Sequence, residues 1–182
     1  SLNPKSPIYS FNHQGTPISD AEILDLIRMA LKVSKESNGA FDITVAPLVE
    51  LWGFYEKAPH LPQDQQIKDC LKTVGYQHIS LENGKLEKDD KGVKIDLGGI
   101  AKGYAVSQAT KVLKENGVTS ALIDAGGDIY ALGKMGKRLW KVGIRNPRGK
   151  EGSPGDAILG YIEVGEDGIL GYVEVEDLAV IG

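Results

Sequence analysis

The sequence predicts an α+β fold, in which helices and antiparallel hairpins occupy separate stretches of the chain. In the first part of the chain, apolar residues recur at helical spacing from Ile23 to Leu31. From Ile79 onward, apolar and polar residues alternate, and Asn83-Gly84 separates two such runs. Asn-Gly in this setting is the strongest short signal for a β-hairpin, because both residues tolerate the positive φ angles of a type I′ turn. Helices beside a series of antiparallel hairpins are typical of the α+β class.

Three helices are predicted before the first hairpin. Ser19 and Glu22 fit a capping box, in which each side chain satisfies a free N–H group at a helix start. The apolar residues that follow predict a helix that ends at Asn38-Gly39, directly before residues 40–42. Two shorter helices are predicted over residues 45–52 and 63–71.

The remainder of the chain is predicted to contain strands and one long helix. Residues 94–97 are expected to form a strand, residues 101–116 a helix capped by Gly117, and residues 120–124 another strand. Further strands are predicted over residues 129–132, 140–144, 157–164 and 169–175, the last two as a hairpin across Gly165–Gly168. The segment 147–154 is interpreted as a surface loop because it is rich in glycine, proline and charge.

Length and composition narrow the possible functions. A chain of 182 residues suits one domain or two small subdomains and can bury a core. The net charge of −4 argues against a nucleic-acid binder, which normally carries a basic patch. Cys70 is the only cysteine, so an internal disulfide is impossible, and the three histidines lack metal-ligand spacing. No stretch approaches the length of a membrane span.

The most informative stretch is residues 94–106, which read K-I-D-L-G-G-I-A-K-G-Y-A-V. Paired glycines at the start of a helix expose backbone N–H groups to a phosphate. The alternative is a turn that needs Gly98 and Gly99 only for positive φ or close packing. A second cluster, residues 124–128 with the sequence D-A-G-G-D, follows one helix later. Acids and paired glycines at two strand ends predict one shared pocket.

Neither familiar nucleotide fingerprint matches these glycines. The spacing of Gly98, Gly99 and Gly103 is not G-x-G-x-x-G, and Lys102-Gly103-Tyr104 lacks the G-K-[ST] of a P-loop. A pocket in which backbone groups and carboxylates can approach the ligand suits a polyphosphate that is held through Mg²⁺. This ion takes oxygen ligands and commonly bridges phosphates.

Several of the polar residues allow two interpretations. Asp42 stands between Phe41 and Ile43, where a carboxylate needs either a partner or a ligand. Lys102 could neutralise a pyrophosphate, or it could be paired with Asp96 or exposed. Asp96 itself could hold the loop through backbone N–H groups or accept from a sugar hydroxyl. Asp124 and Asp128 could be a functional carboxylate pair or an Asx-type turn, and we favour the first.

Four segments of the chain resemble the ApbE family, the FAD:protein FMN transferases. They are residues 37–54, 94–106, 121–130 and 140–147, and residues 6–12 match more loosely. The resemblance implies one partial ApbE-like FAD-binding and FMN transferase domain over residues 1–182. It also implies a T-fold-like layout, an antiparallel sheet with helices on one side.

The resemblance assigns ligand contacts residue by residue. It implies that FAD is contacted by Ala40, Phe41, Asp42, Gly98 and Tyr104, with Asn12 at the entrance, although Phe41 could instead be core and Asn12 a turn cap. Their chemistry adds five further residues to the predicted FAD contacts, namely Asp96, Gly99, Lys102, Asp124 and Asp128. It implies that the backbone carbonyl of Ala101 is a ligand of Mg²⁺. From their apolar neighbours, we expect Asp42 and Asp96 to serve the cofactor rather than the fold.

The implied reaction is Mg²⁺-dependent transfer of FMN from FAD to a threonine hydroxyl of an acceptor flavoprotein, with release of AMP. A noncatalytic FAD-binding module is the alternative. Family members of this kind continue past the match with further segments that carry the metal-binding Asp and Thr, so the chain is expected to be a fragment that lacks them and an N-terminal strand, and to be inactive by itself. The catalytic residues are unknown. The resemblance further implies an extracytoplasmic, lipid-anchored whole protein, with membrane contact only through an anchor outside this segment.

Overall fold

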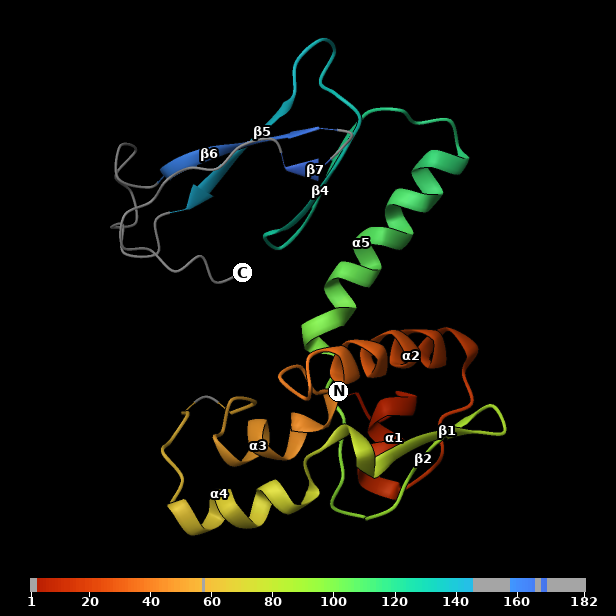
Figure 1. Ribbon diagram of the computed structural model, residues 1–182, viewed down its shortest axis with the longest axis vertical. Coiled ribbons are helices and arrows are strands. Elements are labelled where there is room, and N and C mark those ends of the chain that lie inside the picture. The colour runs from red at the N-terminus through yellow and green to blue at the C-terminus, as the bar shows by residue number, and fades with distance from the viewer. Residues whose placement is uncertain (1–2, 57, 146–157, 166–167, 170–182) are drawn as a thin grey trace. The chain divides into compact units, whose positions relative to one another are not determined.

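The computed structural model describes residues 3–56, 58–145, 158–165 and 168–169. The chain divides into two compact units, Ser1–Ala101 and Lys102–Gly182 (Figure 1). Helices and antiparallel strands both occur, which confirms the predicted α+β class. No helix within the described ranges is long and apolar enough to cross a membrane.

The described residues of the first unit form four complete α-helices, three 3₁₀ turns and one hairpin, and they include the start of a fifth helix. The helices are α1 (Pro7–Gln14), α2 (Ala21–Glu36), α3 (Ala46–Leu51) and α4 (Asp64–Cys70), and the 3₁₀ turns are η1 (Ile43–Val45), η2 (Leu71–Thr73) and η3 (Tyr76–His78). The hairpin pairs β1 (Ile79–Glu82) with β2 (Lys85–Lys88).

Local signals set the helix ends. Ser6 caps α1 by accepting from the N–H of Ile8, and Gly15 ends the helix at φ 70°. Sequence reasoning missed α1, although a Ser-Pro start and a Gly stop are ordinary helix signals. The start of α2 differs from the predicted capping box, because Asp20 rather than Ser19 caps it by accepting from Ile23 N–H at 2.9 Å. A carboxylate at this position also interacts favourably with the positive end of the helix dipole.

The β1–β2 hairpin forms at the predicted Asn-Gly turn. Asn83 and Gly84 adopt φ angles of 49° and 72°, as a type I′ turn requires. The far edge of β2 is paired as well, because Leu86 and Ile18 exchange backbone hydrogen bonds of 2.9 and 3.3 Å. Both side chains are almost fully buried. The hairpin is therefore fastened to the segment that leads into α2.

The core of the first unit joins the helices to the hairpin. Its buried apolar members come from α1, the segment before α2, α2, η1, both strands and the segment after β2. They are Ile8, Phe11, Ile18, Leu24, Ile27, Ala30, Ile43, Ile79, Leu86, Val93 and Ile95. Burial of apolar area on this scale is the main force that holds the unit together.

The predicted strand over residues 94–97 does not form. Residues 93–97 belong to no helix and no sheet. In place of a strand partner, the buried side chain of Asn12 donates to Ile95 O at 2.9 Å and accepts from Ile95 N–H at 2.8 Å. The next N–H, that of Asp96, donates to Ile43 O at 2.7 Å. The side-chain amide of Asn12 thus forms the two backbone hydrogen bonds of Ile95 that a neighbouring strand would otherwise form.

Asp42 has three hydrogen bonds within the fold. Its Oδ1 accepts from the N–H of Thr44 at 2.8 Å and from the Thr44 hydroxyl at 2.7 Å. Its Oδ2 accepts from the N–H of Tyr76 at 2.6 Å. The carboxylate thus caps η1 and ties it to η3, so the expectation that Asp42 serves the cofactor rather than the fold was wrong in excluding a structural role.

The second unit contains most of α5 (Gly98–Glu115) and five strands. The strands are β3 (Ala121–Ala125), β4 (Asp128–Leu132), β5 (Trp140–Arg145), β6 (Ile158–Gly165) and β7 (Gly168–Ile169). All pairing among the described strands is antiparallel, as predicted, and it is divided among three small sheets, β1–β2, β3–β4 and β5–β6–β7. The loop predicted over 147–154 and most of the strand predicted over 169–175 lie outside the described residues.

Asn12 provides the first test of this arrangement. Replacement of Asn12 by the similarly sized Leu should lower the free energy of unfolding by about 2–4 kcal/mol, because the buried N–H and C=O of Ile95 both lose their partner. Urea unfolding followed by circular dichroism measures the change. As a control, Gln65→Leu removes an exposed amide of α4 and should change stability by less than about 0.5 kcal/mol. Equal stability of the two variants would contradict the role of Asn12.

Asp42 gives a second test of stability. Asp42→Asn should cost about 1–3 kcal/mol, because the new NH₂ group faces an N–H donor whichever way the amide is turned. Asp90→Asn is the matched control, since Asp90 is exposed and uses one oxygen to accept from Gly92 N–H, which an amide oxygen can still do. Thermal and urea unfolding of both variants would reveal the difference. If the Asp42→Asn protein were as stable as the unchanged protein, the structural role of Asp42 would be contradicted.

Candidate functional site

The helix α5 begins directly at the paired glycines. Gly98 N–H donates to Asp96 Oδ1 at 2.6 Å, and the N–H groups of Ile100 and Ala101 both donate to Leu97 O. The exposed N–H of Gly99 has no hydrogen bond to any residue that the structure describes. Because the amides of a first helical turn carry the positive end of the helix dipole, Gly99 offers a donor to an anion.

The two positions require glycine because other side chains lie close to them, and not because of their backbone conformation. Neither Gly98 nor Gly99 has a positive φ angle. A Cβ atom on Gly99 would lie 3.2 Å from Phe41 Cε2, and one on Gly98 would lie 2.9 Å from Asp96 Oδ1. The glycines therefore let the ring of Phe41 and the carboxylate of Asp96 lie against the start of the helix.

Asp96 is held by two groups of the protein. Besides Gly98 N–H, its carboxylate accepts from the hydroxyl of Tyr55. Burial and the adjacent Asp96 carboxylate raise the pKa of Tyr55, so the phenol stays protonated and remains a donor. The loop-holding role that we considered for Asp96 is thus present in the structure, and acceptance from a sugar hydroxyl stays a prediction.

Ala40 and Asp42 line a separate small cavity. It has a volume of about 270 Å³ and is bounded by the end of α2 and by the segment from Val74 to Gln77. Small-molecule pockets commonly measure roughly 300–1,000 Å³, so this one could hold only part of a dinucleotide. Gly39, at φ 82°, turns the chain from α2 into this cavity.

In the second unit, Lys102 and Asp128 form an ion pair between α5 and β4. The Asp128 Oδ2 atom is buried, and the Lys102 ammonium is its partner there. The sequence allowed Asp96 as an alternative partner of Lys102. Within the second unit, the partner of Lys102 is Asp128. A lysine held by a carboxylate is less available to neutralise a ligand phosphate.

Asp124 and Asp128 do not form a carboxylate pair on one face. In the β3–β4 register, Asp124 lies opposite Ile129, and Ala125 lies opposite Asp128. Because side chains alternate along a strand, the two acids point to opposite faces of the hairpin. Asp124 Oδ1 accepts from Gly127 N–H at 2.7 Å, so this carboxylate stabilises the Gly126-Gly127 turn. The turn interpretation therefore has direct support for Asp124.

The predicted metal ligand is the backbone carbonyl of Ala101. Ala101 lies in the first turn of α5, and its carbonyl has one lone pair beyond that needed by the helix. Within the described ranges, no three residues of the types His, Cys, Asp and Glu come together in a way that could hold a metal ion. Because Mg²⁺ usually keeps several waters and takes one or two carboxylates together with substrate phosphates, Ala101 stays a predicted ligand.

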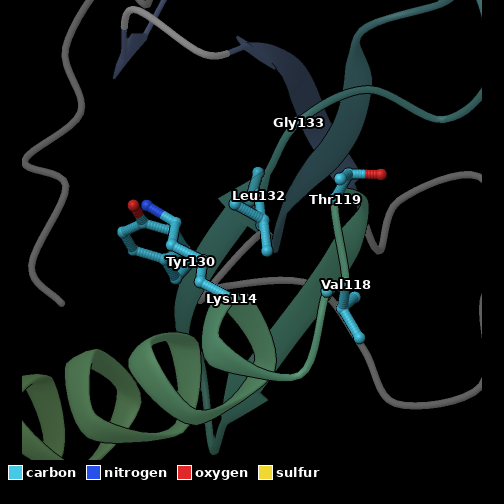
Figure 2. A pocket seen from close by; sticks show the side chains of 8 residues that line it. Lys114, Val118, Thr119, Tyr130, Leu132 and Gly133 are labelled. Carbon is cyan, nitrogen blue, oxygen red and sulfur yellow. The ribbon is translucent and has the colours of Figure 1, made fainter.

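The cavity of the second unit lies away from its candidate residues. It measures about 430 Å³ and is bounded by the end of α5 and by β4. Figure 2 shows Lys114, Tyr130 and Leu132 among the side chains around it. Lys102, Tyr104, Asp124 and Asp128 do not line this cavity, and Tyr104 is half-buried on α5.

Within the first unit, hydrogen bonds and packing gather most of the predicted residues. Asn12 holds Ile95, Asp96 N–H bonds to η1 beside Asp42, and Phe41 lies close to Gly99. Sequence reasoning missed Tyr55, which holds Asp96 across a separation of 41 residues. No local pattern in the sequence signals that contact.

Comparison with known proteins shows the family and the fold of the chain. The model of the ApbE family matches residues 1–171. The FAD:protein FMN transferase of Escherichia coli K12 is 32% identical over 159 residues, which cover 84% of this chain and 44% of that protein. An ApbE protein of Thermotoga maritima superposes with a TM-score of 0.78 at 34% identity, over 90% of this chain and 53% of that one. The flavin transferase ApbE from Vibrio cholerae gives a TM-score of 0.76 at 28% identity.

The chain spans about half the length of the relatives that it matches. The match nevertheless extends over both units and includes every residue proposed for the site. On this basis, the chain belongs to the ApbE family.

Proposed function

We propose that this protein transfers FMN from FAD to a threonine hydroxyl of an acceptor flavoprotein, and that residues 1–182 supply part of the FAD-binding surface. The proposal draws support from curated relatives that carry the name FAD:protein FMN transferase. The observation that carries it is the free N–H of Gly99 at the start of α5, beside Phe41 and the held carboxylate of Asp96.

In this proposal, the start of α5 receives one phosphate of FAD. The Gly99 N–H donates to a phosphate oxygen, and the missing side chain lets that oxygen approach. The Asp96 carboxylate already brings negative charge to the helix start, so a second anion is disfavoured unless a cation accompanies it. A Mg²⁺ ion on the pyrophosphate would supply that charge, and Mg²⁺ dependence is part of the proposal.

The bond changes of the proposed reaction balance without a redox partner. The threonine oxygen forms a bond to the FMN-side phosphorus of FAD, and the bond from that phosphorus to the bridging oxygen breaks. AMP leaves with the bridging oxygen, and the hydroxyl proton passes to a base, because a threonine hydroxyl is a poor nucleophile. We assign no residue to that base and no step to the metal.

A noncatalytic FAD-binding module is the second candidate. The structural roles of Asp42 and Asp124 favour it slightly, because these carboxylates serve the fold and leave fewer groups for chemistry. Both candidates require FAD binding, and only the first requires a modified acceptor.

The glycine hypothesis is tested with Gly99→Val. The new side chain would meet Phe41 and cover the free N–H, so FAD affinity should fall about 10- to 100-fold, the loss of one hydrogen bond to a charged group. Titration of FAD fluorescence quenching measures the affinity, and circular dichroism verifies the fold. Gly103→Val on the same helix is the matched control, since a Cβ atom there meets nothing within 4 Å. Unchanged affinity in folded Gly99→Val would reject a phosphate at this helix start.

Transfer is tested by the mass of an acceptor protein. The protein is incubated with FAD, Mg²⁺ and an acceptor flavoprotein, and the acceptor should gain one FMN while AMP is released. EDTA should prevent the gain, and an acceptor with the target threonine replaced by alanine should show none. FAD binding without any gain would favour the noncatalytic module. Transfer by residues 1–182 alone would place the catalytic groups inside this segment.

A further inference from the structure

A cavity of about 640 Å³ lies between α2 and β1, and none of the residues proposed to contact FAD lines it. Its apolar side chains are Leu31, Ile79 and Leu81, which continue the buried core of the first unit to the surface. We call this cavity, bounded by residues 28–36 and 76–81, the α2–β1 groove. Figure 1 shows α2 and β1 within the same unit.

The groove has a basic rim on a chain that is acidic as a whole. Arg28, Lys32 and Lys35 line it from α2, against a single acid, Glu36. The chain carries a net charge of −4. Lys32 lies 3.8 Å from Glu36, and Arg28 pairs with Asp25, but all four side chains are largely exposed, so these pairs are weak. Lys35 forms no ion pair with any described residue.

The floor of the groove includes the unpaired edge of a strand. Leu86 directs its N–H and C=O away from β1, because it exchanges both hydrogen bonds with Ile18. Leu81 is the residue opposite Leu86, so its own N–H and C=O point away from β2. Ile79, two residues earlier, has the same orientation. Neither residue has a backbone partner on that side among the described residues.

We propose that the α2–β1 groove binds an extended, acidic segment of a partner protein, which adds as a strand to the edge of β1. Ile79 and Leu81 supply the backbone hydrogen bonds, alternate apolar side chains of the segment contact Leu31 and Leu81, and its carboxylates reach the ammonium groups of Lys32 and Lys35. Strand addition of this kind takes affinity from the backbone and specificity from the flanking side chains. The proposal is independent of FMN transfer.

The charge of the rim selects this occupant over a second copy of the chain. Pairing of two β1 edges would bring the lysines of both copies together, and like charges at a strand edge oppose such pairing. An acidic segment has the opposite effect, since each carboxylate gains a cation.

The probe is an eight-residue peptide that alternates Glu and Val, blocked at both ends and labelled for fluorescence anisotropy. We expect saturable binding at low salt, with no binding of the Lys-Val peptide of the same length. Lys32→Gln with Lys35→Gln should weaken binding about 3- to 10-fold, as loss of two exposed ion pairs predicts. Lys68→Gln with Lys72→Gln, on α4 and η2, is the matched control because it removes the same charge outside the groove.

Hydrogen exchange distinguishes strand addition from attraction of charge alone. On binding of the Glu-Val peptide, the amides of Ile79 and Leu81 should exchange at least about tenfold more slowly, because each gains a hydrogen bond. The Ser80 amide, already paired with β2, should not change and serves as an internal control.

Three outcomes would overturn the proposal. They are equal binding by the two double-lysine variants, binding without protection of Ile79 and Leu81, and a concentration-dependent dimer in sedimentation velocity that the peptide does not dissociate. Because Lys32 and Lys35 are exposed on α2, their replacement should leave the fold intact, which circular dichroism verifies.

Discussion

The site depends on one buried side chain amide. Asn12 pairs with both backbone groups of Ile95 and thereby fixes a segment that has no strand partner. That segment places Asp96 beside η1 and delivers the chain to Gly98 at the start of α5. An amide can satisfy a donor and an acceptor at once, which no apolar side chain can do. The position of the exposed Gly99 N–H follows from this contact.

The carboxylates near the site are used mainly to hold backbone. Asp42 accepts three hydrogen bonds that join η1 to η3, and Asp96 joins α5 to Tyr55. Charge-assisted hydrogen bonds to backbone N–H groups are stronger than neutral ones, so they fix loops that have little apolar surface to bury. A rigid loop helps ligand binding indirectly, because less conformational entropy is lost when the ligand orders it.

The helix α2 takes part in two surfaces of the first unit. Its C-terminal end, through the left-handed residues Asn38 and Gly39, sets the position of Ala40 and Phe41. Its exposed basic face forms the rim of the α2–β1 groove. These roles use different parts of the helix, and Tyr76 lines both the α2–β1 groove and the cavity beside Ala40 and Asp42.

The sequence alone determined the features whose causes are local. The Asn83-Gly84 hairpin, the end of α2 at Asn38-Gly39 and the long helix after the glycines were all predicted, because turns and caps depend on residues within one or two turns of the chain. The family could also be predicted, since its motifs lie in register along the chain. Only the tertiary structure decided which distant group each polar side chain meets. Residues 94–97 have the composition of a strand, but Ile95 forms hydrogen bonds with the Asn12 side chain and not with a second strand. Asp42 accepts from the N–H of Tyr76, and Asp96 accepts from the hydroxyl of Tyr55. A carboxylate among apolar neighbours needs a hydrogen-bonding partner. The residues next to it in the sequence do not indicate whether that partner is a ligand or a distant part of the fold.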